Sequence, residues 1–184
     1  MKKTESSMTM AEPNTEKRKL DKRRLIAYWG AGVAVVLLDQ ITKVVVDWRF
    51  PLNYSQPVIP GVFDLVHVRN YGAAWGMFAG RTWLLGVVSL VALVLLVANF
   101  RRMTEDKVFN EWILSIVGGG IAGNMIDRFL RGSVVDFLDF HWKEVYHYPS
   151  FNVADMAISV GVCLYVAYAF FGKKKDRAAE EASK

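Results

Sequence analysis

Four long apolar stretches, separated by polar segments, dominate the chain near residues 25–46, 82–100, 111–130 and 151–171. A helix needs roughly 20 apolar residues to cross the hydrocarbon core of a bilayer, so each stretch predicts a transmembrane helix. The stretch 82–100 has no charged residue and is the clearest, whereas 111–130 includes a glycine run that permits close helix packing. The first stretch is too long for the core of a cleavable secretory signal, so we expect a permanent helix.

The segment 47–81 predicts a small sheet outside the helices. Three prolines punctuate it, and residues 62–70 are rich in β-branched side chains with partial alternation, which is typical of a strand. Residues 137–148 are aromatic and mixed in polarity, and here we expect an interfacial loop or a short helix. The expected fold class is an all-α membrane protein, with four transmembrane helices and a small extracytoplasmic β-sheet segment between helices one and two.

The basic residues predict the orientation of these helices. Of the 23 lysines and arginines, eight lie in 1–24, three in 101–107 and five in 173–184. Because positive residues concentrate on the cytoplasmic side of membrane proteins, we expect both termini in the cytoplasm and residues 47–81 and 131–150 outside. The clustering indicates topology signals and contacts with anionic lipid rather than a nucleic-acid surface.

Three parts of the chain follow from this pattern. Residues 1–24 are expected to form a hydrophilic basic cytoplasmic tail, residues 25–172 the four-helix membrane domain, and residues 173–184 a second basic cytoplasmic tail. The single cysteine, Cys163, falls inside the fourth apolar stretch, where we expect it to be buried.

Polar residues gather at the outer ends of the predicted helices and in the segments beside them, while the inner halves carry almost none. One shared site near the outer membrane surface explains this distribution more simply than several unrelated ones. The residues concerned are Asp39, Lys43, Asn70, Gly72, Asn124, Asp127, Arg128, Asp136, Asn152 and Asp155.

Several of these residues also have purely structural interpretations. Asp39 and Lys43 are four residues apart on one helix, so an ion pair is about as plausible as a contact with substrate. Asn124, Asp127 and Arg128 share one helix face, and for the last two we favour a network that ties helices together. For Asn124 we favour a role in the site.

Two further residues and the histidines carry similar alternatives. Asn70 and Gly72 alone fit an ordinary turn better than a functional role, and Asn152 has the spacing to cap the fourth helix. The three histidines are expected at the surface or the membrane interface rather than as ligands.

Asp136 and Asp155 carry the chemistry that we expect. Ionisable residues in or beside a membrane are costly and are functional candidates by default, and two nearby carboxyl groups that share one proton provide an acid and a base at neutral pH. The sequence contains no His-Glu-x-x-His zinc motif and no Gly-x-Ser-x-Gly nucleophile motif. An aspartic protease that uses neither metal nor cofactor is the remaining interpretation, with water as nucleophile.

Two other functions compete with proteolysis. A proton-coupled transporter also uses intramembrane carboxylates, although the polar residues stop at one face and do not trace a path across the membrane. An assembly factor whose aspartates only hold helices together would tolerate substitution by asparagine.

Five motifs, in this order, resemble the bacterial lipoprotein signal peptidases, the type II signal peptidases. They cover the chain from about residue 25 to 171 and read Asp-Gln-Ile-Thr-Lys from residue 39, Asn-Tyr-Gly-Ala-Ala-Trp-Gly from 70, Gly-Gly-Ile-Ala-Gly-Asn-Met-Ile-Asp-Arg from 119, Val-Val-Asp-Phe from 134 and Phe-Asn-Val-Ala-Asp from 151.

The resemblance implies a globomycin-sensitive aspartic endopeptidase of the bacterial inner membrane, with its site near the outer face. Its substrates would be prolipoproteins whose lipobox cysteine already bears diacylglycerol, and cleavage would fall just before that cysteine. Asp136 and Asp155 would be catalytic. The supporting or substrate-positioning residues would be Asp39, Asn70, Asn124, Arg128 and Asn152. We further expect a monomer in contact with membrane lipid, and a clamp or cover over the site formed by segment 47–81.

Overall fold

All four predicted helices are present in the computed structural model, which describes residues 22–104, 107–143 and 145–172. They are α1 (Lys22–Arg49), α2 (Thr82–Thr104), α3 (Val108–Leu130) and α4 (Val153–Ala167), the last continued by a π-helical turn over Tyr168–Gly172. Each is long and apolar enough to cross a bilayer, so the chain is a multi-pass membrane protein. Most of the predicted tail 1–24 and all of 173–184 lie outside the described residues.

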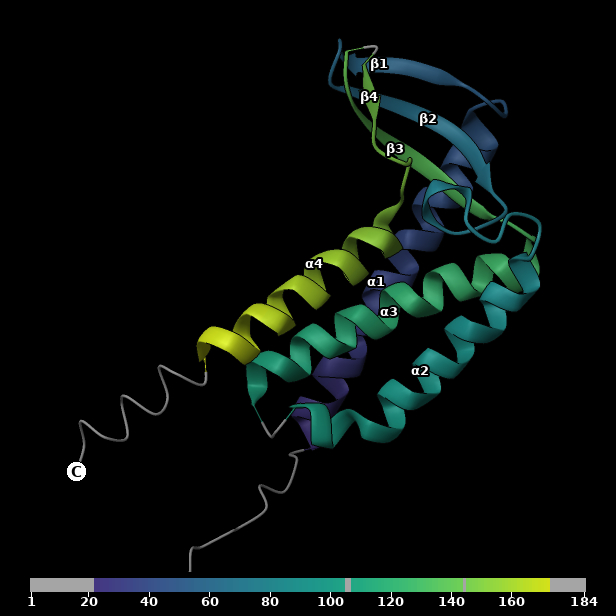
Figure 1. Ribbon diagram of the computed structural model, residues 1–184. Coiled ribbons are helices and arrows are strands. Elements are labelled where there is room, and N and C mark those ends of the chain that lie inside the picture. The colour runs from purple at the N-terminus through teal and green to yellow at the C-terminus, as the bar shows by residue number, and fades with distance from the viewer. Residues whose placement is uncertain (1–21, 105–106, 144, 173–184) are drawn as a thin grey trace, which may run out of the picture.

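Helix α3 is the centre of the bundle. It packs against α1, α2 and α4, and Figure 1 shows it running between α2 and α4. The predicted close packing at the glycine run is confirmed, because a Cβ atom on Gly119 would lie 2.4 Å from the carbonyl oxygen of Gly32, and one on Gly120 would lie 2.5 Å from that of Ala154. Glycine is therefore required for α1 and α4 to approach α3 this closely.

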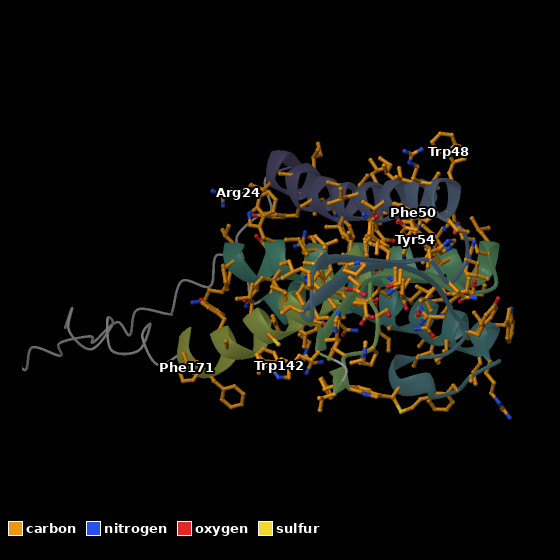
Figure 2. The ribbon with its side chains drawn as sticks, turned by 90° about the horizontal axis from the view of Figure 1, so that it is seen from above. Arg24, Trp48, Phe50, Tyr54, Trp142 and Phe171 are labelled. Carbon is orange, nitrogen blue, oxygen red and sulfur yellow. The ribbon has the colours of Figure 1, made fainter. Side chains whose placement is uncertain are left out.

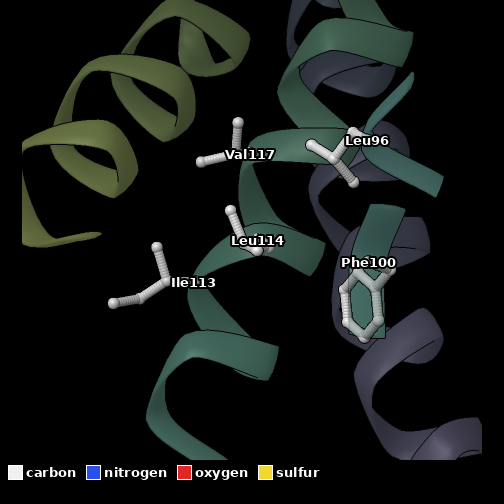
Figure 3. Packing of buried hydrophobic residues seen from close by; sticks show 5 residues of the cluster. All are labelled: Leu96, Phe100, Ile113, Leu114 and Val117. Atoms are coloured by element: carbon white, nitrogen blue, oxygen red, sulfur yellow. The ribbon is translucent and has the colours of Figure 1, made fainter. Parts of the chain in front are cut away.

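An apolar cluster holds together the half of the bundle that lies away from the sheet. Figure 3 shows Leu96 and Phe100 of α2 beside Leu114 of α3. Ile113 and Val117 lie on the side of α3 that faces α4, where Gly161 leaves room for the methyl groups of Val117. α3 thus joins α2 to α4 through two different faces.

A four-stranded antiparallel sheet covers the other end of the bundle (Figure 1). Its strands are β1 (Ser55–Ile59), β2 (Phe63–Asn70), β3 (Val134–Trp142) and β4 (Tyr146–His147), in the order β1-β2-β3-β4. The strand predicted at residues 62–70 is confirmed as β2. The sheet as a whole is not confined to the segment between helices one and two, because β3 and β4 come from the segment between α3 and α4.

The expectation of a loop or short helix at residues 137–148 is therefore wrong. Val135 and Phe137 of β3 are buried against Val46 near the end of α1, and backbone pairing with β2 satisfies the polar groups of this segment. Both effects depend on partners far away in the sequence, so local polarity alone pointed to a different structure.

The membrane-facing surface is apolar, with aromatic residues at both ends. Figure 2 places Arg24 and Phe171 at the end of the bundle opposite Trp48. Trp48 and Phe171 are 84% and 76% exposed, as expected for rings at the two interfaces. Cys163 is exposed on α4 rather than buried, because in a membrane protein an apolar residue can face lipid as readily as the core.

Candidate active site

Strand β3 carries Asp136 to the place where the sheet meets the helices. The residue is only 2% exposed, and two side-chain amides donate hydrogen bonds to its carboxyl group. Asn152 donates to Oδ1 at 2.7 Å, and Asn70 donates to Oδ2 at 2.9 Å. Val68 of β2 lies opposite Asp136, so Asn70, two residues further on, points to the same face of the sheet.

Asp155 lies in the first turn of α4, where it forms a capping box with Asn152. The backbone N–H of Asp155 donates to Oδ1 of Asn152 at 3.0 Å, and the backbone N–H of Asn152 donates to Oδ2 of Asp155 at 3.3 Å. The side-chain amide of Asn124 donates to Oδ1 of Asp155 at 2.7 Å. The predicted capping role of Asn152 is thus correct, and its side chain in addition binds Asp136.

Lys43 is fully buried and contacts three polar side chains beside the site. Nζ of Lys43 lies 2.8 Å from Asp39, 3.0 Å from Asp127 and 2.9 Å from Oδ1 of Asn124. These three contacts use all three donors of the ammonium group. Of the two interpretations left open for Asp39 and Lys43, the geometry matches the ion pair, since both side chains are 0% exposed.

Asp39 also fixes the beginning of α4. Its Oδ1 accepts a hydrogen bond at 2.9 Å from the backbone N–H of Ala154, the residue that precedes Asp155. Gly123 makes the approach possible, because a Cβ atom there would lie 2.5 Å from Oδ2 of Asp39. Asp39 therefore links α1, α3 and the helix that bears Asp155.

Asp127 belongs to a second network, as expected for it. It accepts hydrogen bonds from the backbone N–H of Val135 at 3.2 Å, from Gln40 at 3.0 Å and from Arg131. Arg131 also donates to Gln40 at 2.8 Å. Sequence reasoning did not find Gln40 and Arg131, although the spacing of four residues between Asp127 and Arg131 was a usable signal.

Arg128 ties different elements together. Its guanidinium donates to the carbonyl oxygens of Asn124 at 3.3 Å and of Gly72 at 3.5 Å. It thereby connects α3 to the loop after β2, as the network interpretation expected, but its hydrogen bonds go to these carbonyl groups rather than to Asp127.

The predicted turn at Asn70 and Gly72 is present. Oδ1 of Asn70 accepts a hydrogen bond from the backbone N–H of Gly72 at 2.9 Å, while the amide of the same side chain reaches Asp136. A Cβ atom on Gly72 would lie 2.6 Å from the carbonyl oxygen of Met77. The turn and the site are therefore not alternatives, since one asparagine forms both.

A cleft of about 500 Å³ opens above Asp136, within the range of roughly 300–1,000 Å³ typical of ligand pockets. Its walls come from the end of β2, the loop 71–79 and the segment 147–150. Asn70, Gly72, Trp75, Asp136 and Tyr148 are among the lining residues. Asp136 lines the floor of this cleft, whereas Asp155 is not among the residues that line it.

The surroundings of Asp136 favour its protonated form. Burial, followed by the nearby charge of Asp155, raises its pKa from 3.8 to about 7. The hydrogen bonds from Asn70 and Asn152 and the charge of Lys43 oppose this rise. A carboxyl group that keeps its proton close to neutral pH can act as a general acid.

Three further polar side chains are buried. His67 is 4% exposed, which excludes the surface alternative expected for it, and its ring nitrogens lie 2.9 Å from the carbonyl oxygen of Phe50 and 2.9 Å from Asp47. Almost no polar residues were expected in the half of α3 away from the sheet, and Asn110 and Glu111 are buried there. Among the described residues, no group of three or more His, Cys, Asp or Glu side chains could hold a metal ion.

Comparison with known proteins gives a consistent result. A family model described as "Signal peptidase (SPase) II" matches residues 31–171. The lipoprotein signal peptidase of Desulforapulum autotrophicum is 40% identical over 163 residues, covering 85% of this chain and 99% of that protein. That of Haemophilus influenzae is 43% identical over 152 residues, covering 80% and 86%.

The fold of the chain is also similar to that of solved structures. A bacterial membrane enzyme solved by the in meso method at 2.3 Å resolution has a TM-score of 0.72 and 31% identity, over 82% of this chain and 90% of that chain. A second such structure, at 1.9 Å resolution, has a TM-score of 0.69 and 32% identity, over 79% and 93%.

Proposed function

The chain belongs to the signal peptidase II family and is a protease that removes signal peptides from prolipoproteins, and we propose that Asp136 and Asp155 form its catalytic pair. One observation carries the proposal: Asn152 donates from its side chain to Asp136 and caps α4 together with Asp155. A single residue thus fixes both carboxyl groups relative to each other. Membership in this family makes the transporter and assembly-factor alternatives unnecessary.

The two carboxyl groups are assigned different roles. Asp136 has a pKa of about 7, which supports the role of general acid. Asp155, which accepts hydrogen bonds from Asn124 and from the backbone of Asn152, is assigned the role of general base. The sequence alone left these two roles unassigned.

The proposed reaction uses these groups in two steps. Asp155 takes a proton from a water molecule as its oxygen attacks the scissile carbonyl carbon, while Asp136 donates its proton to the carbonyl oxygen. The tetrahedral intermediate collapses when Asp155 passes its proton to the leaving amine nitrogen and Asp136 recovers a proton from the hydroxyl group. Both residues return to their starting states, so no cofactor is consumed.

The substrate is proposed to be a prolipoprotein whose cysteine already carries diacylglycerol, cut just before that cysteine. The position of the cleft supports this, because it opens where the sheet meets the ends of the membrane helices. Acyl chains embedded in the membrane would hold the peptide bond at this depth and contribute binding energy for its orientation. The loop 71–79, within the segment expected to clamp the site, lines the cleft.

The orientation and location are proposals that rest on charge. Both termini are assigned to the cytoplasm and the sheet to the outer face of the bacterial inner membrane, because basic residues cluster in the two tails and between α2 and α3. We further propose that the protein is a monomer, is sensitive to globomycin and binds no nucleic acid.

A cleavage assay with the purified full-length protein and a lipidated precursor tests the catalytic pair. Asp136→Asn and Asp155→Asn are each expected to abolish product formation, with thermal unfolding showing that both variants remain folded. Asp64→Asn is the matched control, since this acid lies on β2 with Ser55 and His141 as partners. Cleavage at near wild-type rate by either site variant would refute the pair.

A further inference from the structure

A second groove lies in the inner half of the bundle, on the membrane-facing side between α2 and α4. It has a volume of about 620 Å³ and is lined by Ala92, Leu95, Leu96, Asn99, Arg102, Met103 and Tyr165. It shares no residue with the cleft above Asp136. α3 packs against both walls, whereas α2 and α4 make little contact with each other within the described residues.

The groove follows one face of α2. Its lining residues on this helix recur at spacings of three and four, from Ala92 to Met103, so they form a continuous stripe. From Ala92 to Arg102 the helix rises about 15 Å, which is about half of the roughly 30 Å hydrocarbon core. The groove therefore has the length of one membrane leaflet.

The two ends of the groove differ in chemistry. Ala92 and Leu95 make the end toward the middle of the membrane apolar, and Arg102 and Asn99 lie at the end toward the basic loop. Arg102 is the only charged residue among the described residues that line it. The hydroxyl of Tyr165 donates to the carbonyl oxygen of Met103 at 2.8 Å and joins α4 to α2 at this end.

We propose that this groove binds one anionic phospholipid of the inner leaflet, with an acyl chain between α2 and α4 and the phosphate at Arg102. The apolar stripe matches the chain, and the single guanidinium matches an anionic headgroup. A helix of a secretory signal is a poorer occupant, because its positively charged start would lie beside Arg101 and Arg102. This site is independent of the catalytic pair.

Lipid binding to the purified full-length protein in detergent tests the proposal, with phosphatidylglycerol and phosphatidylcholine as probes in native mass spectrometry and thermal unfolding. Phosphatidylglycerol is expected to bind more tightly and to raise the unfolding midpoint more, because a ligand of the native state stabilises it. Equal binding of the zwitterionic lipid, or equal stabilisation by inorganic phosphate alone, would overturn the proposal.

Three variants locate the site. Arg102→Gln is expected to weaken phosphatidylglycerol binding about fivefold, whereas Arg101→Gln, one residue away and outside the groove, leaves it unchanged. Ala92→Phe fills the apolar end from an exposed position and is expected to reduce binding of the acyl chain. The proposal fails if Arg101→Gln weakens binding as much as Arg102→Gln, if Ala92→Phe has no effect, or if a photo-crosslinker at Leu95 captures a precursor's signal helix instead of lipid.

Discussion

The side-chain amide of Asn152 donates to Oδ1 of Asp136 at 2.7 Å, across the boundary between α4 and β3. The same amide lies 3.3 Å from the carbonyl oxygen of Val135 and 3.2 Å from Oδ1 of Asn124, and the side-chain oxygen caps α4. One fully buried side chain therefore serves as helix cap and as hydrogen-bond donor to a carboxyl group of the site.

Asn152→Ser separates these two roles. Serine is a good N-cap, but its side chain is too short to reach Asp136. Cleavage is expected to fall by about 10²–10³-fold, the usual loss when a positioned donor in an active site is removed. Stability should fall by about 1–3 kcal/mol, because buried partners lose a hydrogen bond. Initial rates and chemical unfolding measure the two effects, and a stable variant with unchanged cleavage would contradict this role.

The raised pKa of Asp136 predicts how cleavage depends on pH. As the proposed acid, Asp136 must carry a proton, so the rate should fall as pH rises above about 7. As pH rises from about 4 to about 7, the free energy of unfolding should also fall. Over this range Asp136 keeps its proton in the native state, whereas in the unfolded chain, where its pKa is 3.8, it has already lost it. Cleavage rates and unfolding midpoints across pH 4–9 test both statements.

Asn70→Ser should move this alkaline limit upward. The hydrogen bond from Asn70 lowers the pKa of Asp136, and serine can still accept from the N–H of Gly72 while no longer reaching the carboxyl group. The descending limb of the pH profile is expected at higher pH than in the wild type. A limb that stays in place or moves to lower pH would show that Asn70 does not act on Asp136.

Gly123→Ala tests the packing beneath the site. A Cβ atom there would lie 2.5 Å from the buried carboxyl group of Asp39, so we expect a loss of about 1–3 kcal/mol from overpacking. Gly30→Ala on α1 is the control, since a Cβ atom there meets nothing within 4 Å. That change should be neutral or stabilise by up to about 1 kcal/mol. Equal unfolding curves for the two variants would contradict the close approach.

Lys43→Met should be among the most damaging substitutions outside the catalytic pair. Lys43 is the partner of both Asp39 and Asp127, and its removal leaves the buried carboxylate of Asp39 without a cation and that of Asp127 with Arg131 alone. A loss of about 3–5 kcal/mol is expected, as for other broken buried ion pairs. Asp39→Asn, which keeps an acceptor near Lys43 and Ala154, should cost less. If chemical unfolding gave the reverse order, Lys43 would not be the residue that holds the two buried carboxylates in place.

The four helices and the strand at residues 62–70 were predictable because their signals are local. Apolar length alone identifies a membrane span, and β-branched residues identify β2. Strand β3 was missed because it is stabilised by Val46 and by pairing with β2, both distant in sequence. Cys163 was misplaced because an apolar stretch in a membrane does not reveal which face is buried.

The residues that gather at the site were predictable from the sequence, but the hydrogen bonds among them were not. The outer clustering of polar residues brought together Asp39, Lys43, Asn124 and Asp127, which do lie in contact. Asn152 was expected either only to cap a helix or to support the site, and in the structure its side chain both caps α4 and donates to Asp136. The buried Glu111 had no sequence signal to distinguish it from a surface residue of the basic loop.

The sheet joins segments that lie far apart in the order of synthesis. Asn70 reaches Asp136 from a strand made before α2, while both proposed catalytic acids follow α3. A ribosome-bound chain that has inserted only its first hairpin therefore carries an orienting amide but no acid–base pair. On the proposed assignment, the acid–base pair is complete only once the start of α4 has been made.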